Sequence, residues 1–381
     1  MNSVRLAVGI LFVVLVSQAC TAALAQSPDQ KPSTAPSITK CQDGCLDGCL
    51  DGCRPSWNEA CPSVYVQVEG LFMMREPRFT QQPIIVDATA GTTLVSTSDL
   101  DFNFDPGVRA TVGMRLCGGR ALEFSYFGLF EGDASAFAVK PGENSFLIFP
   151  DNFTGNVFVD MDEVHVDYSS WLHSFELNLP CCSGCCDTCD SGKGGEKGKD
   201  GGKGSCGEVR CRSFEWFAGF RYLNLGEELN IAAQRTVSGQ IEEGSYNIRT
   251  ANHLYGAQLG ARVRRSRGLF GWEATGKAGI FGNDAQQTQS ATEFPNFALR
   301  PTVSSSDGVV AFVGEVNLSA LYRLTDVWNV RAGYNAMWIE GLALAPDQLD
   351  FDFATASSGS RLRNGGGMFL HGVSAGLEAR W

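Results

Sequence analysis

The stretch DLDFNFDPGVRATVGMRL (residues 99–116) determines the expected fold, because its side chains alternate in character almost throughout. In an extended chain, successive side chains point to opposite sides. One parity is apolar and consists of Leu100, Phe102, Phe104, Val108, Ala110, Val112, Met114 and Leu116. The other parity is polar and includes Asp99, Asp101, Asp105, Arg109 and Arg115. The pattern predicts a strand with one apolar and one charged face.

The composition limits the class of protein. The chain has 381 residues, of which 19% are charged and 44 are glycine, and this glycine-rich, moderately charged balance favours a β-rich fold over a disordered chain or a helical membrane protein. The formal net charge of −12 argues against a nucleic-acid partner, since nucleic-acid-binding proteins present basic surfaces.

The N-terminus has the layout of a secretory signal. One arginine precedes an apolar run from Leu6 to Val16, and the small-x-small sequence Ala23-Leu24-Ala25 follows, which predicts a signal peptide over residues 1–25. A lipoprotein anchor at Cys20 is the alternative. No later apolar stretch is long enough for a transmembrane helix, so an exported protein of this sequence would enter a membrane only as a closed barrel.

Three regions follow the signal peptide. Residues 26–63 are expected to form a flexible linker and a cysteine-rich tail, and residues 64–381 a barrel interrupted by a Cys/Gly/Lys-rich periplasmic insert at 180–212. Ten alternating segments are expected as strands. They are residues 64–74, 99–116, 121–130, 164–179, 213–225, 253–263, 269–281, 309–323, 327–340 and 368–381.

The links between these segments alternate in length. Short links (117–119, 264–268 and 324–326) follow the second, sixth and eighth segments, whereas a long link follows every odd segment. Bacterial outer-membrane barrels combine an even strand number, tight periplasmic turns and long external loops. The sequence therefore predicts an all-β, antiparallel up-and-down transmembrane barrel of about ten strands, within a range of about eight to twelve.

Aromatic residues agree with a membrane-spanning strand. Trp328 and Trp338 lie ten residues apart on one face, as do Phe312 and Tyr322, and ten tilted strand residues cover roughly 25 Å, the height of the apolar band of such barrels. The chain ends on Trp381, at the end of an alternating segment. This terminal aromatic residue is expected to be the signal read by the outer-membrane assembly machinery.

The stretches VQVEGLFMMRE, ALEFSYFGLFEG and RLTDVWNVRAGYNAMWIEGLALAPDQLDF, with the stretch at 99–116, resemble the outer-membrane porin family catalogued as the seventh putative beta-barrel porin family. The resemblance covers about residues 64–381 and implies a barrel in the bacterial outer membrane, in contact with its lipid. The insert departs from the plain barrel pattern, and the resemblance implies nothing for it.

Charged residues of the inward parity are the candidate functional residues. If they line an open lumen, they would set the selectivity of a narrow porin for small ions or solutes, and if they pair with one another, they would fill the barrel. The candidates are Arg109, Arg115, Glu123, Arg221, Glu273, Lys277, Glu315 and Arg331. Both alternatives stay open at the level of sequence.

The cysteines predict disulfides in an oxidising periplasm. Of the 14 cysteines, 13 remain once Cys20 is removed, and this odd number leaves one thiol for an intermolecular bond to a second copy or to the cell wall. A soft-metal site in the same tracts is the alternative. The candidates are Cys41, Cys45, Cys49, Cys53, Cys61, Cys117, Cys181, Cys182, Cys185, Cys186, Cys189, Cys206 and Cys211.

The sequence assigns neither a cofactor nor a catalytic site. The main hypothesis is a narrow porin without enzymatic activity, and the alternative is a structural surface barrel with a filled lumen, linked to neighbours or the cell wall through its cysteines. A remote alternative is a barrel hydrolase that uses His165 or His173 in the stretch HVDYSSWLH (165–173).

Overall fold

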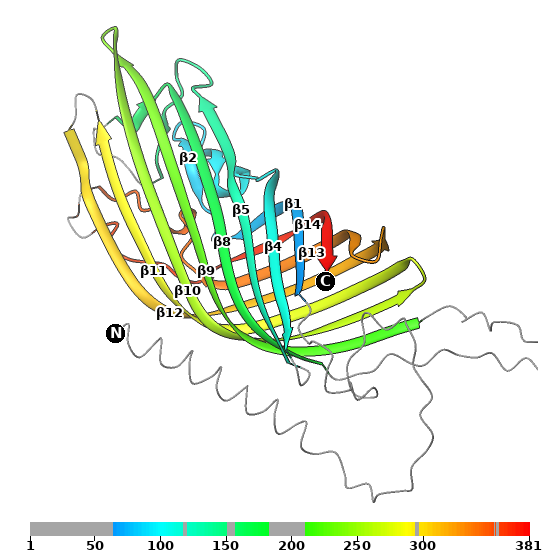
Figure 1. Ribbon diagram of the computed structural model, residues 1–381. Coiled ribbons are helices and arrows are strands. Elements are labelled where there is room, and N and C mark those ends of the chain that lie inside the picture. Colours follow the sequence, from blue (N-terminus) through cyan, green and yellow to red (C-terminus); the bar gives the residue numbers. More distant parts are fainter. Residues whose placement is uncertain are drawn as a thin grey trace, which may run out of the picture.

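Ten antiparallel strands close into one barrel, which confirms the predicted fold class (Figure 1). The structure is a computed structural model and describes residues 64–116, 120–150, 157–182, 210–293, 297–353, 355 and 358–381. The barrel strands are β1 (Val64–Arg78), β4 (Phe104–Leu116), β5 (Arg120–Val139), β8 (Glu163–Cys182), β9 (Arg210–Val237), β10 (Gln240–Arg267), β11 (Phe270–Glu293), β12 (Phe297–Arg323), β13 (Trp328–Leu342) and β14 (Gly366–Arg380).

The last barrel strand closes the barrel on the first. β14 pairs with β1, with Leu377 opposite Val68, and the remaining strands follow in antiparallel order. The backbone N–H of Trp381 donates to the carbonyl of Val64 at 2.9 Å, so both ends of the barrel chain lie at the end with short turns. Short turns mark the periplasmic end of an outer-membrane barrel. Within the described residues no helix has the length and apolar character needed to cross a membrane.

The stretch at 99–116 divides between two environments. Phe104, Val112 and Met114 are 54%, 47% and 38% exposed on the outer wall, whereas Asp105 and Arg109 are buried inside the barrel. An apolar outer face suits lipid and a charged inner face suits the interior, which explains the alternation.

The prediction that this strand begins at residue 99 is wrong. Leu100 and Phe102 precede β4 and are buried in an inner hydrophobic core, because the chain there forms the short 3-10 helix η1 (Thr97–Asp99) and turns inward. The apolar alternation continues across this change because an inner core also needs apolar side chains.

Several barrel strands extend well beyond the membrane. On β9 the outward-facing residues of 214–224 are mostly apolar or aromatic, and Glu228 is the first charged outward residue beyond them. A strand needs about 9–11 residues to cross a bilayer, so residues 214–224 form its membrane-crossing part. The predicted link at 226–252 is instead the outer half of the β9–β10 hairpin, closed at Ser238 and Gly239, whose φ angles of 51° and 79° are positive.

A second, four-stranded sheet lies within the external end of the barrel, on the concave side of the tall wall (Figure 1). Its strands are β2 (Pro83–Asp87), β3 (Thr92–Ser96), β6 (Leu147–Ile148) and β7 (Val159–Met161). Ile84, Ile85 and Leu147 from this sheet share one hydrophobic core with Val166 and Ile231 of the barrel wall. Segments that the sequence predicted as long external links therefore contain strands that fill the external end of the barrel.

Several predictions lie outside the described residues. These are the signal peptide, the tail at 26–63, the link at 117–119 and nearly all of the insert and the cysteines. Of the insert ends, Cys182 belongs to β8 and Cys211 to β9.

Candidate functional site: the barrel interior

Glu315 of β12 is the centre of a first group of buried charges. Its carboxylate is 2.9 Å from Nη2 of Arg109, 2.8 Å from Nη1 of Arg221 and 3.2 Å from Nζ of Lys277. Lys277 and Arg221 also contact Glu176 of β8, at 2.9 and 3.5 Å. Two carboxylates and three cations from five strands thus pair across the lumen, and Arg109 also reaches a third carboxylate, Glu69, at 3.7 Å.

Arg331 of β13 is the centre of a second group. Its guanidinium contacts three carboxylates: Glu69 at 3.2 Å, Glu273 at 2.8 Å and Glu378 at 2.7 Å. Arg264 of β10 binds Glu378 from the other side at 2.8 Å. A planar guanidinium with several donors suits this multiple pairing.

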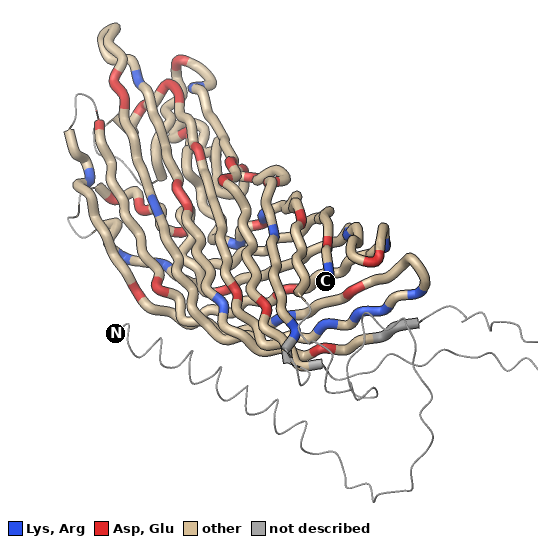
Figure 2. The backbone as a smooth tube through the Cα atoms, viewed as in Figure 1, with Lys and Arg blue, Asp and Glu red and all other residues tan. Residues whose placement is uncertain are grey.

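A third group lies around Arg262 of β10. Arg262 contacts Glu123 at 2.9 Å and Glu215 at 3.4 Å, and Arg115 contacts Glu215 at 3.5 Å. The Tyr65 hydroxyl donates to Glu123 at 2.5 Å. In Figure 2 both acidic and basic segments occur over the lower barrel wall.

The structure places all eight lumen candidates inside the barrel and in these three groups. They are Arg109, Arg115, Glu123, Arg221, Glu273, Lys277, Glu315 and Arg331. Arg264 is not among the predicted lumen residues, because it lies in the predicted turn 264–268. Arg264 shares the inward parity of Arg262, two residues away, and that signal could have extended the strand.

The charges of the first two groups have little access to solvent, whereas the Arg115 and Arg262 side chains of the third group are 29% and 18% exposed. Glu69 and Arg221 are 1% exposed, Glu315 is 2% and Arg331 is 3%. Side chains that line a water-filled channel would be exposed to the water in it. The charged level of this barrel is therefore packed with its own side chains.

An apolar level follows on the external side of the charges. Inward-facing residues of many strands form one cluster that includes Leu71, Met73, Leu223, Leu225 and Leu254, each 0–1% exposed. The polar side chains at this level are few and buried: Ser174 stands opposite Leu223, Asn283 opposite Leu254, and Asp105, opposite Met73, is paired with Arg75 at 2.8 Å. The layer is otherwise apolar, so an ion that crossed it would lose most of its hydration shell.

A chain segment crosses the barrel above this apolar layer. Near the end of β13 the backbone turns at Gly341, whose φ is 84°, and residues 343–349 enter the interior, where all are buried; we call them the inward segment. Asn252 of β10 both donates to the carbonyl and accepts from the N–H of Ala343, each at 2.8 Å. Glu227 of β9 accepts from the N–H of Ala345 at 2.8 Å. The barrel wall thus holds the segment by its backbone.

Glu227 is the acidic member of these anchors. It lies beyond the membrane-crossing part of β9, and burial raises its pKa to about 7, although the Ala345 N–H favours the ionised form. Ser170 and Thr250 stand directly opposite it on β8 and β10, and both are buried. At neutral pH a large part of the Glu227 population is therefore protonated.

The histidines of the proposed hydrolase stretch lie on the outer wall. His173 Nδ1 is hydrogen-bonded to the Tyr126 hydroxyl at 2.8 Å, and His165 Nε2 contacts Glu163 at 2.6 Å. Neither contact involves Asp167 or Ser169 of the stretch. Among the described residues there is also no group of three or more His, Cys, Asp or Glu side chains placed to hold a metal ion.

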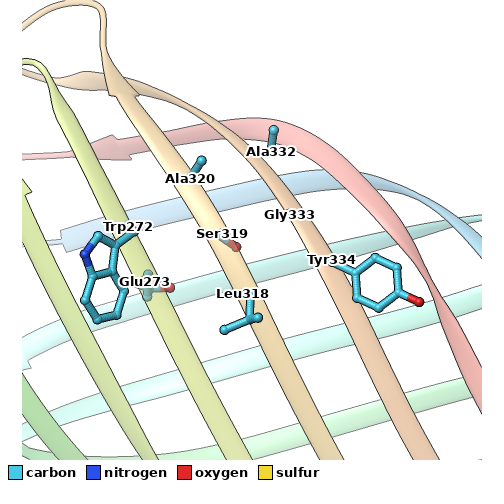
Figure 3. Close-up of a pocket in the computed structure, with 8 residues that line it drawn as sticks. All are labelled: Trp272, Glu273, Leu318, Ser319, Ala320, Ala332, Gly333 and Tyr334. Atoms are coloured by element: carbon cyan, nitrogen blue, oxygen red, sulfur yellow. The ribbon is translucent and has the colours of Figure 1, made fainter.

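A hollow of about 420 Å³ lies over β11, β12 and β13 (Figure 3). Trp272, Leu318 and Tyr334, which line it, are 46%, 54% and 48% exposed on the outer wall. The hollow therefore opens toward the membrane and is not an entrance to the interior.

Comparison with known proteins agrees with this architecture. The sequence profile of the family described as "Putative beta barrel porin-7 (BBP7)" matches residues 77–381. Among curated proteins, none matches the chain.

Solved outer-membrane proteins match the chain only at low identity and low TM-score. The outer membrane protease OmpT from Escherichia coli is 10% identical, with a TM-score of 0.41, over 84% of this chain and 97% of that one. A FadL homologue of Pseudomonas aeruginosa is 8% identical, with a TM-score of 0.24, over 84% and 90%. An anion-selective porin from Comamonas acidovorans is 9% identical, with a TM-score of 0.14, over 85% and 100%. At these values the likenesses say nothing about activity.

Proposed function

Since the chain belongs to the beta barrel porin-7 (BBP7) family and is an outer-membrane β-barrel protein, we propose that it acts as a sealed surface barrel and not as an open diffusion channel. The proposal covers the barrel with its filled lumen, and it assigns no enzymatic activity. It selects the filled-lumen alternative among the hypotheses that the sequence left open.

One observation carries the proposal: at three successive levels of the barrel most side chains that face the interior are buried. The charges at the periplasmic end, the apolar layer above them and the inward segment with the four-stranded sheet lie in series along the barrel axis. An ion would have to break buried ion pairs and then cross an apolar layer, which costs several kcal/mol for each step.

A sealed barrel would act through contacts that its external and periplasmic surfaces make with other molecules. The outer halves of β9, β10, β11 and β12 rise beyond the membrane and present a β-sheet wall to the outside of the cell. On the periplasmic side, the cysteine-rich tail and insert remain candidates for disulfides that link the barrel to a second copy or to the cell wall.

Liposome swelling tests the proposal. Vesicles that contain the refolded mature protein are placed in isotonic solutions of small sugars and amino acids, with an open porin as positive control. We expect no swelling above that of protein-free vesicles. Swelling that depends on solute size would contradict a sealed barrel.

The narrow porin is the second candidate. The observation in its favour is that several hydrogen bonds that hold the inward segment are neutral, including those of Asn252 with Ala343 and that of Gln289 with the carbonyl of Gln348, and these could break without leaving an unpaired charge. Swelling that occurs only in a variant lacking residues 343–349, and not in the wild type, would support a gated channel over a permanently sealed barrel.

A further inference from the structure

The four histidines of the chain all lie on the outer wall, and three of them share one arrangement. His173 of β8 pairs through Nδ1 with the Tyr126 hydroxyl at 2.8 Å. His253 of β10 pairs in the same way with Tyr222 at 3.0 Å, and His371 of β14 with Tyr334 at 2.8 Å. The same pair has thus formed three times around the barrel from different local sequences.

The three pairs lie at one level, the external edge of the apolar band. In each pair the two residues have the same relative position on neighbouring strands. The histidine stands opposite the residue that follows its tyrosine by two positions toward the external side. These residues are Gly128 for His173, Asn224 for His253 and Ala336 for His371. The first charged outward residues follow immediately, namely Asp284 on β11, Glu76 on β1 and Glu228 on β9. This is the depth of lipid headgroups, where aromatic and amphipathic side chains gather.

Aromatic rings fix the orientation of the imidazoles. Trp171 lies 5.5 Å from His173, Phe369 lies 5.2 Å from His371 with an angle of 28° between the rings, and Tyr222 stacks on His253 with an angle of 5°. Because Nδ1 is bound to the tyrosine, Nε2 is the atom that can bind a ligand, and at His371 a ligand would compete with Glu76 for it. Rings that are already oriented lose little conformational freedom when they bind.

The charges around the three imidazoles differ. Glu76 lies 3.2 Å from Nε2 of His371, and Asp284 stands directly opposite His253. The residues opposite His173 are Gly128 and Asn224, and its titratable contact is Tyr126. His173 therefore meets the least competition from carboxylates.

We propose that the three Tyr–His pairs form a binding ring for phosphate groups of outer-leaflet lipids. Nε2–H donates a hydrogen bond to a phosphate oxygen, and protonation of the imidazole adds a positive charge. Phosphates are the anions found at this depth of a bilayer, and histidine is the side chain whose charge ordinarily changes near neutral pH. The ring holds lipid more firmly in mildly acidic than in alkaline surroundings, with His173 the strongest site.

Lipid retention measured by native mass spectrometry tests the proposal. The full mature protein, folded in a neutral detergent, is incubated with phosphatidylglycerol or with a diacylglycerol of the same acyl chains, at about pH 6 and about pH 8. The variants are the triple His173→Phe/His253→Phe/His371→Phe and the matched control His165→Phe. His165 also lies on the outer wall but contacts Glu163 and no tyrosine hydroxyl.

We expect wild type and His165→Phe to retain several-fold more phosphatidylglycerol at the lower pH, and the triple variant to lose this difference. Diacylglycerol should be retained equally by all proteins at both pH values. If the triple variant fails to fold, the corresponding glutamine variant, which keeps a neutral donor, should retain phosphatidylglycerol without pH dependence. Equal pH-dependent retention by wild type and either triple variant would overturn the proposal.

Discussion

Replacing Glu315 with glutamine probes the sealed interior, because it removes one charge and almost no volume. Glu315 is 2% exposed and lies within 3.2 Å of three cations. Loss of one partner from a buried ion pair costs about 3–5 kcal/mol, since the remaining charges stay buried. We expect Glu315→Gln to lower the free energy of unfolding by about 4 kcal/mol.

The assay is urea unfolding in lipid vesicles, followed by tryptophan fluorescence. The matched control is Glu228→Gln, which removes a carboxylate that is paired with Arg249 at 2.8 Å but has a 38% exposed side chain on the external wall. Exposed pairs contribute about 0–1 kcal/mol, so this variant should unfold almost as the wild type does.

A small loss of unfolding free energy in Glu315→Gln would contradict a sealed, dry interior. In a water-filled lumen, water would screen the three cations and reduce each charge interaction to about 1 kcal/mol. A loss below about 1 kcal/mol for Glu315→Gln, equal to that of the control, would mean that the interior is hydrated and the barrel is open.

Three further predictions concern the levels above the charges. Burial raises the pKa of Glu227 from 4.5 to about 7, so the folded state favours the protonated carboxyl. The free energy of unfolding should therefore fall by about 3 kcal/mol as the pH rises from about 5 to about 8. Urea unfolding at these two pH values should show the fall in the wild type and no fall in Glu227→Gln. Leu254→Ala, in the apolar layer, should cost about 2–5 kcal/mol in the same assay, whereas Leu259→Ala, 57% exposed toward lipid, should cost less than about 1 kcal/mol; equal losses would contradict a packed interior. Asn252→Ala should remove both bonds to Ala343 and increase amide hydrogen exchange in the inward segment, and unchanged exchange would show that these bonds do not hold it.

The membrane-crossing part of the fold could be predicted from sequence because lipid imposes a strict alternation. Val112 and Met114 face lipid while Arg109 and Arg115 face the interior, and ten such segments gave all ten barrel strands. The same period of two also identified the eight interior charges, since every second residue of a wall strand must point inward.

Outside the membrane the alternation is inverted, because apolar residues such as Leu229 and Ile231 face the inner core and polar residues such as Glu228 face water. The outer halves of β9 and β10 have polar outward residues, so the segment 226–252 was expected as a loop although it is a continuous hairpin. The ladder there is maintained by backbone hydrogen bonds and by an inner core, neither of which leaves a lipid-type pattern in the sequence.

The inward segment was not predicted because local periodicity does not show where a loop folds. Its apolar residues Leu344 and Leu349 stand in what was expected to be an external link, from Gly341 to Gly367. Apolar residues in an exposed link are unfavourable in water, and this anomaly is the signal that could have indicated an inward fold. The pairing of the buried charges depends on register between distant strands, which one sequence does not contain.

Single-channel conductance of the refolded protein in a planar bilayer is the most direct test of whether the barrel interior is sealed. Folding and insertion are checked first on the same sample by heat-dependent mobility in gels and by circular dichroism. We expect no conductance steps at any applied voltage, because interior charges such as Arg331, which is 3% exposed, are packed against other side chains. Discrete, voltage-stable steps whose ion selectivity changes when Arg331 is neutralised would contradict this expectation and establish an open pore.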